Sequence, residues 1–170
     1  MGCGVTILKK ILVLTFDDNY LKVVSHMITD KEFEINENTN FINFKYRQKN
    51  ILFTFLSNRQ KWTWLHHFSG TYGIIIIYEG NDVRNNINEI ENILNSNVLN
   101  KRPLILIFDK SSLEDKDYTV LEKIRFNLYK RNIKFIIQFI DFSNNIIIKD
   151  NKNLELYYGL EWLFHEINTK

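Results

Sequence analysis

The feature that most constrains this chain is the stretch from Ile11 to Ile28, which reads ILVLTFDDNYLKVVSHMI. It begins with a continuous apolar run, typical of a strand buried on both faces, and continues with apolar residues at helical spacing. Many α/β proteins hold phosphate in the loop between such elements, using glycines, a lysine and a metal-binding hydroxyl. The loop here has no glycine and carries Asp17 and Asp18, which would cap the helix and repel phosphate. The stretch therefore predicts a capped first helix with no phosphate ligand.

Length and composition indicate one globular domain. The chain has 170 residues, of which 45% are hydrophobic and 25% charged, which is enough for a sizeable core. A net charge of +2 gives no case for nucleic acid as a partner. No apolar run approaches the roughly 20 residues that a membrane-spanning helix needs. The single cysteine, Cys3, excludes a disulfide framework, so we expect a reducing, cytoplasmic location.

The first residues match a pattern for lipid attachment. Met1-Gly2-Cys3-Gly4-Val5-Thr6 fits M-G-x-x-x-[ST], in which Gly2 takes a myristoyl chain, and the neighbouring Cys3 is a site for palmitate. One myristoyl chain anchors only marginally, so stable attachment would need the second signal. The pattern is short and also occurs by chance, which leaves two interpretations of the tail 1–8. Either it is unmodified, or it holds the protein peripherally at the cytoplasmic face of a membrane.

Apolar periodicity predicts alternating strands and helices over the rest of the chain. Two extended runs, 41–46 and 51–56, are joined by a polar turn and predict an antiparallel hairpin. Further elements are predicted as strands at 73–78, 104–108 and 134–139, as helices at 81–94, 119–130 and 154–167, and as an aromatic helix or turn at 62–68. The residues expected to point inward from the helix at 119–130 are Leu121, Ile124, Leu128 and Tyr129. This order predicts one α/β domain over residues 9–170, with a mainly parallel sheet covered on both faces.

Several segments, taken in order, resemble one known family. They are KNILFTF at 49–55, WLHHF at 64–68, TYG at 71–73, ND at 81–82 and YGLEWL at 158–163. This series resembles the Arf (ADP-ribosylation factor) and Arf-like small GTPases over nearly the whole chain. The resemblance implies a Ras-like G domain with a six-stranded, mixed, mainly parallel sheet and helices on both faces. It also implies a switch mechanism in which GTP and magnesium order two loops.

The departures from the family fall on the nucleotide site. Where the family has its Gly-Lys-Thr-Thr phosphate loop, this chain has Tyr20, then Leu21 at the lysine position and Lys22 at the magnesium-binding hydroxyl. In the first switch, Asn38 replaces the threonine linked to magnesium. The residues that contact the phosphates and the metal ion in the family are therefore replaced in both the phosphate loop and the first switch.

The second switch and the base-reading motif also differ from the family. Ser57 replaces the second-switch aspartate, and the guanine-reading Asn-Lys-x-Asp becomes Asp109-Lys110-Ser111-Ser112, without its final carboxylate. Nucleotide affinity in such sites comes from amides, a lysine and magnesium acting together on the phosphates. Loss of all three predicts a degenerate member of the family that is not an enzyme and needs no cofactor.

Two functions are compatible with this pattern. The first is an Arf-like pseudoGTPase that serves as a protein scaffold or adaptor, in membrane trafficking if the resemblance extends to the pathway. The alternative is an atypical small GTPase that still binds GTP or GDP through Lys22, Asn38 and Lys110, with GTP and Mg²⁺ as cofactors. Titration with nucleotide distinguishes the two.

Candidate partner-binding residues also follow from the resemblance. In the family an aromatic cluster between the two switches docks proteins, and the residues placed there are Phe41, Leu56, Trp64 and His67. The competing interpretation is that Trp62 and Trp64 only pack beneath the second-switch region. The outer strand of the hairpin is, in addition, an edge to which another chain can add. No metal site is predicted, because the adjacent His66 and His67 point in different directions.

Overall fold

Six strands and five α-helices make up most of the computed structural model, which describes residues 8–29, 40–47, 49–78, 83–96, 101–142 and 154–169. The strands are β1 (Lys9–Thr15), β2 (Asn40–Tyr46), β3 (Lys49–Leu56), β4 (Thr71–Tyr78), β5 (Leu104–Asp109) and β6 (Phe135–Ile140). The helices are α1 (Asp18–Thr29), α2 (Trp64–His67), α3 (Val83–Asn95), α4 (Asp115–Lys130) and α6 (Leu154–Asn168). Two short 3-10 segments are η1 (Asn58–Thr63) and η3 (Lys110–Ser112).

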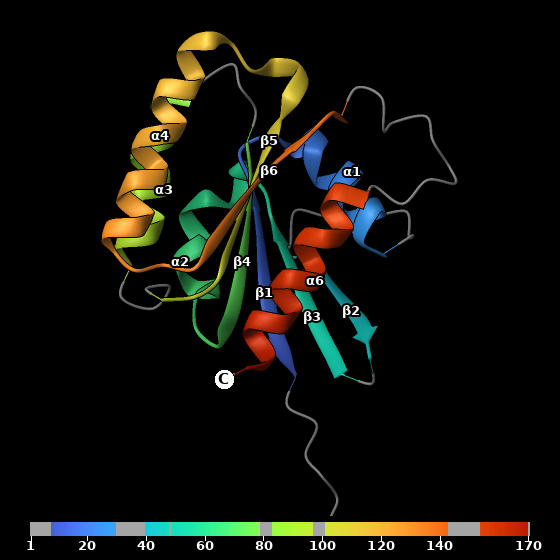
Figure 1. The fold of residues 1–170 in the computed structure, drawn as a ribbon. Helices are drawn as coiled ribbons and strands as arrows, with labels where there is room; N and C mark the ends of the chain where they lie inside the picture. Colours follow the sequence, from blue (N-terminus) through green and yellow to red (C-terminus); the bar gives the residue numbers. More distant parts are fainter. Residues whose placement is uncertain are drawn as a thin grey trace, which may run out of the picture.

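The strands form one sheet in the order β2-β3-β1-β4-β5-β6 (Figure 1). β2 and β3 pair antiparallel as the predicted hairpin, and the other four pairs of neighbours are parallel. This arrangement confirms the predicted α/β fold with a six-stranded, mixed, mainly parallel sheet. It also leaves β2 and β6 as the two edge strands.

Alternating side chains along the central strands build a core on each face of the sheet. In β1, Ile11 and Val13 join the cluster beneath α1 and α6, whereas Leu12 and Leu14 join the cluster beneath α2, α3 and α4. Figure 1 shows these two groups of helices on opposite sides of the sheet. Strands covered on both faces need an apolar residue at every position, which explains the continuous apolar runs of β1, β4 and β5.

Helix α4 departs from the sequence-based prediction at its start and on one face. It begins at Asp115 rather than at 119, because Asp117 forms a capping box in which its Oδ2 accepts the Glu114 amide at 2.8 Å. Three of the four residues expected to point inward are buried, namely Leu121, Ile124 and Leu128. Tyr129 is 63% exposed, so the prediction for it was wrong. Its ring lies at the sheet edge, 5.0 Å from the ring centre of Phe135.

The hairpin is held against α6 by aromatic rings and one carboxylate. The buried ring of Phe164 lies 4.3 Å from that of Tyr46 and 6.3 Å from that of Phe44, between ring centres. One turn earlier in α6, Glu161 accepts hydrogen bonds from the Tyr46 hydroxyl and from Arg47. Burial and the bond to Glu161 raise the pKa of Tyr46 to about 12. The Tyr46 hydrogen bond in turn lowers the pKa of Glu161.

Gly73 allows α6 to lie close to the middle of the sheet. A Cβ atom on Gly73 would lie 3.0 Å from Cδ1 of Leu163 and 3.3 Å from Cγ2 of Ile167, both in α6. Leu163 and Ile167 are buried, so neither can move into solvent to make room. The missing side chain therefore sets the distance between this helix and β4.

Substitution Gly73→Val is expected to lower the free energy of unfolding by about 2 kcal/mol, because the added carbons overpack the contact with α6. Urea unfolding followed by circular dichroism measures the loss. Gly73→Ala adds a single carbon and should cost less. Equal stability of the valine variant and the wild type would contradict this close packing.

Candidate functional site

Three loops meet at the carboxyl edge of the sheet, where parallel α/β folds usually bind ligands. They follow β1, β5 and β6 in the chain. At this edge one hydrogen-bonded cluster joins Tyr20 in the first turn of α1, Asp109 at the end of β5 and Phe142 just after β6. This is the edge at which the sequence resemblance places the nucleotide site.

The loop after β1 is closed by its own hydrogen bonds. Oδ1 of Asp17 accepts the backbone amide of Asn19 at 2.7 Å, which caps the start of α1 as predicted. The Thr15 hydroxyl donates to the Asp17 carbonyl at 2.7 Å and accepts the Asp17 amide at 3.2 Å. Asp18 is the first residue of α1 and adds a second carboxylate to its first turn. Negative charge of the protein itself thus stands at the positive end of the helix dipole.

The two residues that follow Tyr20 in α1, Leu21 and Lys22, lie in different environments. Leu21 is fully buried in the core cluster beneath α1 and α6, together with Val24 and Ile28. Lys22, its neighbour, is exposed. The side chain of Leu21 is apolar, so it contributes none of the side-chain hydrogen bonds around Asp109.

Asp109 ties the three loops together. The residue is buried, with 4% of its surface exposed. Oδ2 accepts the Tyr20 hydroxyl at 2.6 Å, and Oδ1 accepts the Ser111 hydroxyl at 2.8 Å, the Ser111 amide at 3.1 Å and the Phe142 amide at 3.5 Å. The Tyr20 ring also packs edge-on against the Phe142 ring at 4.8 Å between centres. Lys110, next in the chain, is exposed.

A second aromatic cluster closes the region after β3. Ser57 is buried, and its carbonyl accepts the indole N–H of Trp64 at 3.0 Å. The Trp64 ring packs edge-on against Phe16, from the loop after β1, at 5.5 Å between centres. Phe16 also lies 5.6 Å from the ring of Tyr78 at the end of β4. Phe16 therefore joins the loop after β1 to the segment after β3.

The four residues predicted to bind a partner do not form one exposed surface. Phe41 is 55% exposed and His67 is half-buried, but Leu56 and Trp64 lie in the core. A docking role for Leu56 and Trp64 is therefore not supported by their positions, and for Trp64 the packing interpretation holds. Burial beside Lys10 and His66 lowers the pKa of His67. Its carbonyl accepts the Lys10 ammonium at 2.6 Å.

Two exposed apolar residues near this region are not among the four predicted docking residues. Trp62 in η1 is 80% exposed and Leu65 in α2 is 68% exposed. They lie on either side of the buried Trp64 in the chain, and this stretch has no clear periodicity that would show which of its residues face solvent. Only the local geometry of η1 and α2 separates them.

Three predicted site residues, Asn38, Gly2 and Cys3, lie outside the described part of the chain. Among the residues that the structure does describe, no three His, Cys, Asp or Glu side chains are grouped so that they could hold a metal ion. Within that same part of the chain, no helix has the length and apolar character needed to cross a membrane.

Comparison with known proteins identifies the fold. No protein-family model matches this chain, and no curated protein matches its sequence. Among solved structures it is similar to the Arl6 (BBS3) small GTPase of Trypanosoma brucei with the bound nucleotide analogue GppNp. The match has a TM-score of 0.73 and covers 96% of this chain and 99% of that chain, at 10% sequence identity. The chain has the fold of a small GTPase.

The fold allows the location of the cluster around Asp109 to be compared with that of the ligand-binding segments of small GTPases. In small GTPases, as the resemblance implies, the loop after β1 is the phosphate loop and the segment after β5 reads the base. Tyr20 lies in the first turn of α1, directly after the first of these segments, and Asp109 is the last residue of β5, directly before the second. Their hydrogen bond, made by residues 89 apart in the chain, therefore joins the start of α1 to the end of β5. The sequence offered no signal for this bond beyond the two residue types.

Substitution Tyr20→Phe should lower the free energy of unfolding by about 2 kcal/mol, because it removes a donor from a buried carboxylate and leaves the rest of the ring in place. Chemical denaturation measures the change. Tyr158→Phe is the matched control, because Tyr158 is largely exposed and should tolerate the change. An unchanged stability for Tyr20→Phe would show that the bond to Asp109 contributes nothing.

Proposed function

We propose that this chain is an Arf-like pseudoGTPase that works as a protein scaffold or adaptor and has lost the binding and hydrolysis of GTP. The observation that carries the proposal is the bond between Tyr20 and Asp109. A phenol side chain extends from the phosphate-loop position to the base-reading position. In this proposal the protein's own side chains take the position that a nucleotide takes in this fold.

The phosphate end supports the same conclusion. Phosphate binding in this fold needs free backbone amides, but the Asn19 amide is already bonded to Asp17. The family's lysine position is taken by Leu21, which is buried in the core. Each charged hydrogen bond lost from a phosphate is worth roughly 1.5–3 kcal/mol, and two nearby carboxylates add repulsion. Together these changes remove most of the affinity for a triphosphate.

The metal end is altered as well. Magnesium would require the hydroxyl that Lys22 replaces and the carboxylate that Ser57 replaces. Ser57 is buried, with its carbonyl bonded to Trp64, so it supplies no substitute for that carboxylate. We therefore expect neither GTP nor Mg²⁺ as a cofactor, and no enzymatic activity.

The adaptor role rests on the exposed apolar residues around the second-switch region. Trp62, Leu65 and Phe41 expose large apolar side chains, and Trp is a frequent anchor in protein interfaces. In β2, Phe41 alternates with the buried Ile42, so it points to the face of the sheet on which α2 lies. A protein partner at this surface, a role in membrane trafficking and lipid attachment at Gly2 and Cys3 belong to the same proposal.

One observation favours the alternative of an atypical GTPase. The similar structure of the Trypanosoma brucei protein contains the nucleotide analogue GppNp. Binding of GTP or GDP by this chain would then require Tyr20 to leave Asp109, with Lys22, Asn38 and Lys110 as the available contacts. The cluster around Asp109 opposes that movement.

Titration with a fluorescent GTP analogue separates the two functions. We expect no binding tighter than about 100 µM, with or without Mg²⁺, because amides, lysine and metal ligands are all replaced. A small GTPase of the same fold serves as the positive control. Magnesium-dependent binding at micromolar concentration or tighter, or guanine nucleotide retained through purification, would refute the pseudoGTPase proposal.

The partner surface is tested with the double substitution Trp62→Ser and Leu65→Ser. Both side chains are exposed, so the free energy of unfolding should change by less than about 0.5 kcal/mol. Capture of a protein partner by the tagged full chain, identified by mass spectrometry, should be lost. Tyr158→Ser, an exposed change on α6, is the matched control. Partners that bind all three proteins equally would exclude this surface as the docking site.

A further inference from the structure

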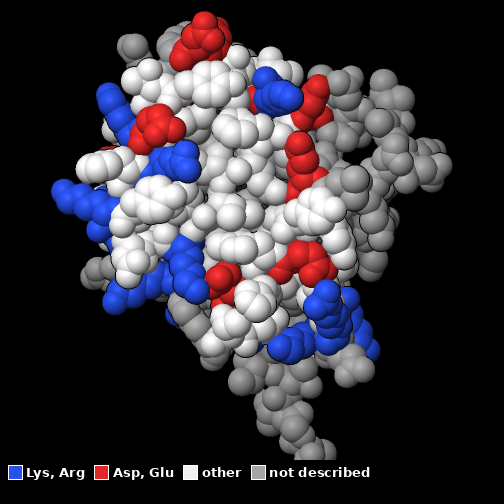
Figure 2. Space-filling view, in the orientation of Figure 1, with Lys and Arg blue, Asp and Glu red and all other residues white. Residues whose placement is uncertain are grey.

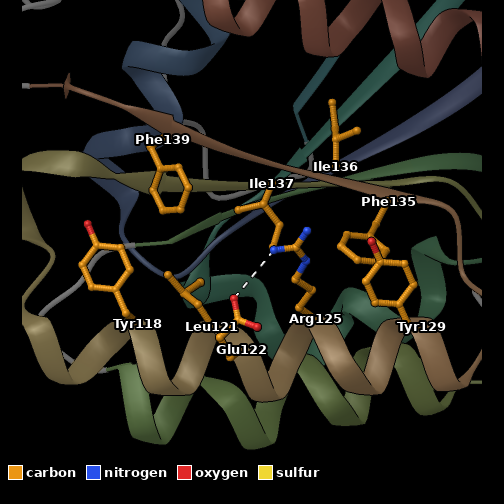
Figure 3. Close-up of a pocket in the computed structure, with 9 residues that line it drawn as sticks. All are labelled: Tyr118, Leu121, Glu122, Arg125, Tyr129, Phe135, Ile136, Ile137 and Phe139. Carbon is orange, nitrogen blue, oxygen red and sulfur yellow. Dashed lines mark ion pairs between the residues drawn. The ribbon is translucent and has the colours of Figure 1, made fainter.

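A groove lies between α4 and the edge strand β6, away from the cluster around Asp109. Its volume is about 390 Å³, and its walls are formed by α4 on one side and by β6 on the other. Figure 3 shows Phe135, Ile137 and Phe139 pointing from β6 toward α4, whereas Ile136 points away. Tyr118 and Tyr129 stand at the two ends of the facing helix. Both tyrosines are more than half exposed.

Among the residues that the structure describes, no strand pairs with the outer edge of β6. The amide of Leu104 in β5 donates to the Lys134 carbonyl at 3.0 Å, so the backbone carbonyl of Lys134 points toward β5. Successive residues of a strand turn their backbone groups to opposite edges. Phe135, Ile137 and Phe139 therefore direct their N–H and C=O groups outward. The same three residues offer both hydrogen-bonding groups at the edge and apolar side chains in the groove.

β6 lacks the features that normally protect an edge strand. Its sequence is FIIQFI, without a charged residue or proline. The opposite edge differs, because the exposed charge of Lys45 lies within β2, whereas the charged residues nearest to β6, Lys134 and Asp141, lie just outside that strand. Figure 2 shows a broad uncharged area in the middle of the face that carries β6, with most charged side chains toward its borders. β6 is thus the less protected of the two edge strands of this sheet.

The residues around the groove are arranged almost as a palindrome. In α4, Tyr118 precedes Glu122 by four positions, and Arg125 precedes Tyr129 by four positions. In β6, two phenylalanines stand at equal distances on either side of Ile137. A two-fold rotation about the centre of the groove therefore exchanges aromatic with aromatic and acid with base. That pattern is self-complementary, as an isologous interface requires.

We propose that this face pairs with a second copy of the chain, through antiparallel addition of β6 to the β6 of the partner about a two-fold axis at Ile137. Phe135 then lies opposite the partner's Phe139, and Ile137 opposite the partner's Ile137. The two sheets become one continuous sheet of twelve strands, twice the six in each copy.

The charged side chains on α4 favour a second copy of the chain, rather than an unrelated strand, as the partner of β6. Glu122 and Arg125 form an ion pair within α4 at 3.7 Å, and both side chains are more than half exposed. Figure 3 shows this pair facing β6 in the middle of the groove. Under the two-fold axis, Glu122 meets the partner's Arg125 and Arg125 meets the partner's Glu122. The pairing depends on neither binding nor loss of nucleotide, so it extends beyond the proposed function.

Charge reversal tests the arrangement in the full chain. Sedimentation velocity from about 1 to 100 µM should show a dimer for the wild type. Glu122→Arg or Arg125→Glu alone places like charges opposite each other and should raise the dimer dissociation constant by about tenfold or more. The double swap Glu122→Arg with Arg125→Glu restores opposite charges and should restore the dimer. Mixing the two single variants should give a 1:1 heterodimer.

Lys123→Glu is the matched control, because Lys123 is exposed on α4, does not line the groove and changes the net charge as Arg125→Glu does. It should leave the dimer unchanged. Amide exchange measured by NMR should show protection of Phe135, Ile137 and Phe139 in the dimer and its loss in either single variant. A wild type that stays monomeric at 100 µM, single variants that dimerise like the wild type, or protection in β2 instead of β6 would each overturn the proposal.

Discussion

A single buried carboxylate organises the carboxyl edge of this sheet. Asp109 accepts hydrogen bonds from groups that follow β1, β5 and β6, so three loops that are distant in the chain share one electrostatic centre. A buried carboxylate is costly unless its oxygens are satisfied, and here the hydroxyls and amides of the protein satisfy them. The shape of this edge therefore depends on internal partners, with Tyr20 contributing the shortest bond of the set.

The two aromatic clusters extend this arrangement in both directions. Tyr20 packs on Phe142 on one side, and Phe16 packs on Trp64 and Tyr78 on the other. Phe16 and Tyr20 both belong to the segment between β1 and the first turn of α1. In this fold that segment normally approaches a ligand with its backbone. In this chain the segment carries two large aromatic side chains, whose rings pack against neighbouring rings.

The sequence allowed the architecture to be predicted because its signals are local and repetitive. Strands buried on both faces read as unbroken apolar runs, and their alternation with amphipathic helices determines a parallel sheet. Tyr129 and the first residue of α4 were missed because a cap at Asp117 and the position of a helix at the sheet edge decide them. The bond between Tyr20 and Asp109 was beyond sequence reasoning, since nothing local links residues 89 apart. Trp62 and Trp64 show the same limit at short range, because two similar residues have opposite exposure.

The attachment of the hairpin to α6 has a mechanical consequence. Phe164 lies between aromatic rings of β2 and β3, while Glu161 binds the end of β2 through Tyr46. Sliding β2 by one residue would invert the faces of its side chains and withdraw Tyr46 from both partners. The hairpin and α6 are therefore joined at two points, Phe164 and Glu161, so a shift of β2 would disturb both of these contacts on the helix.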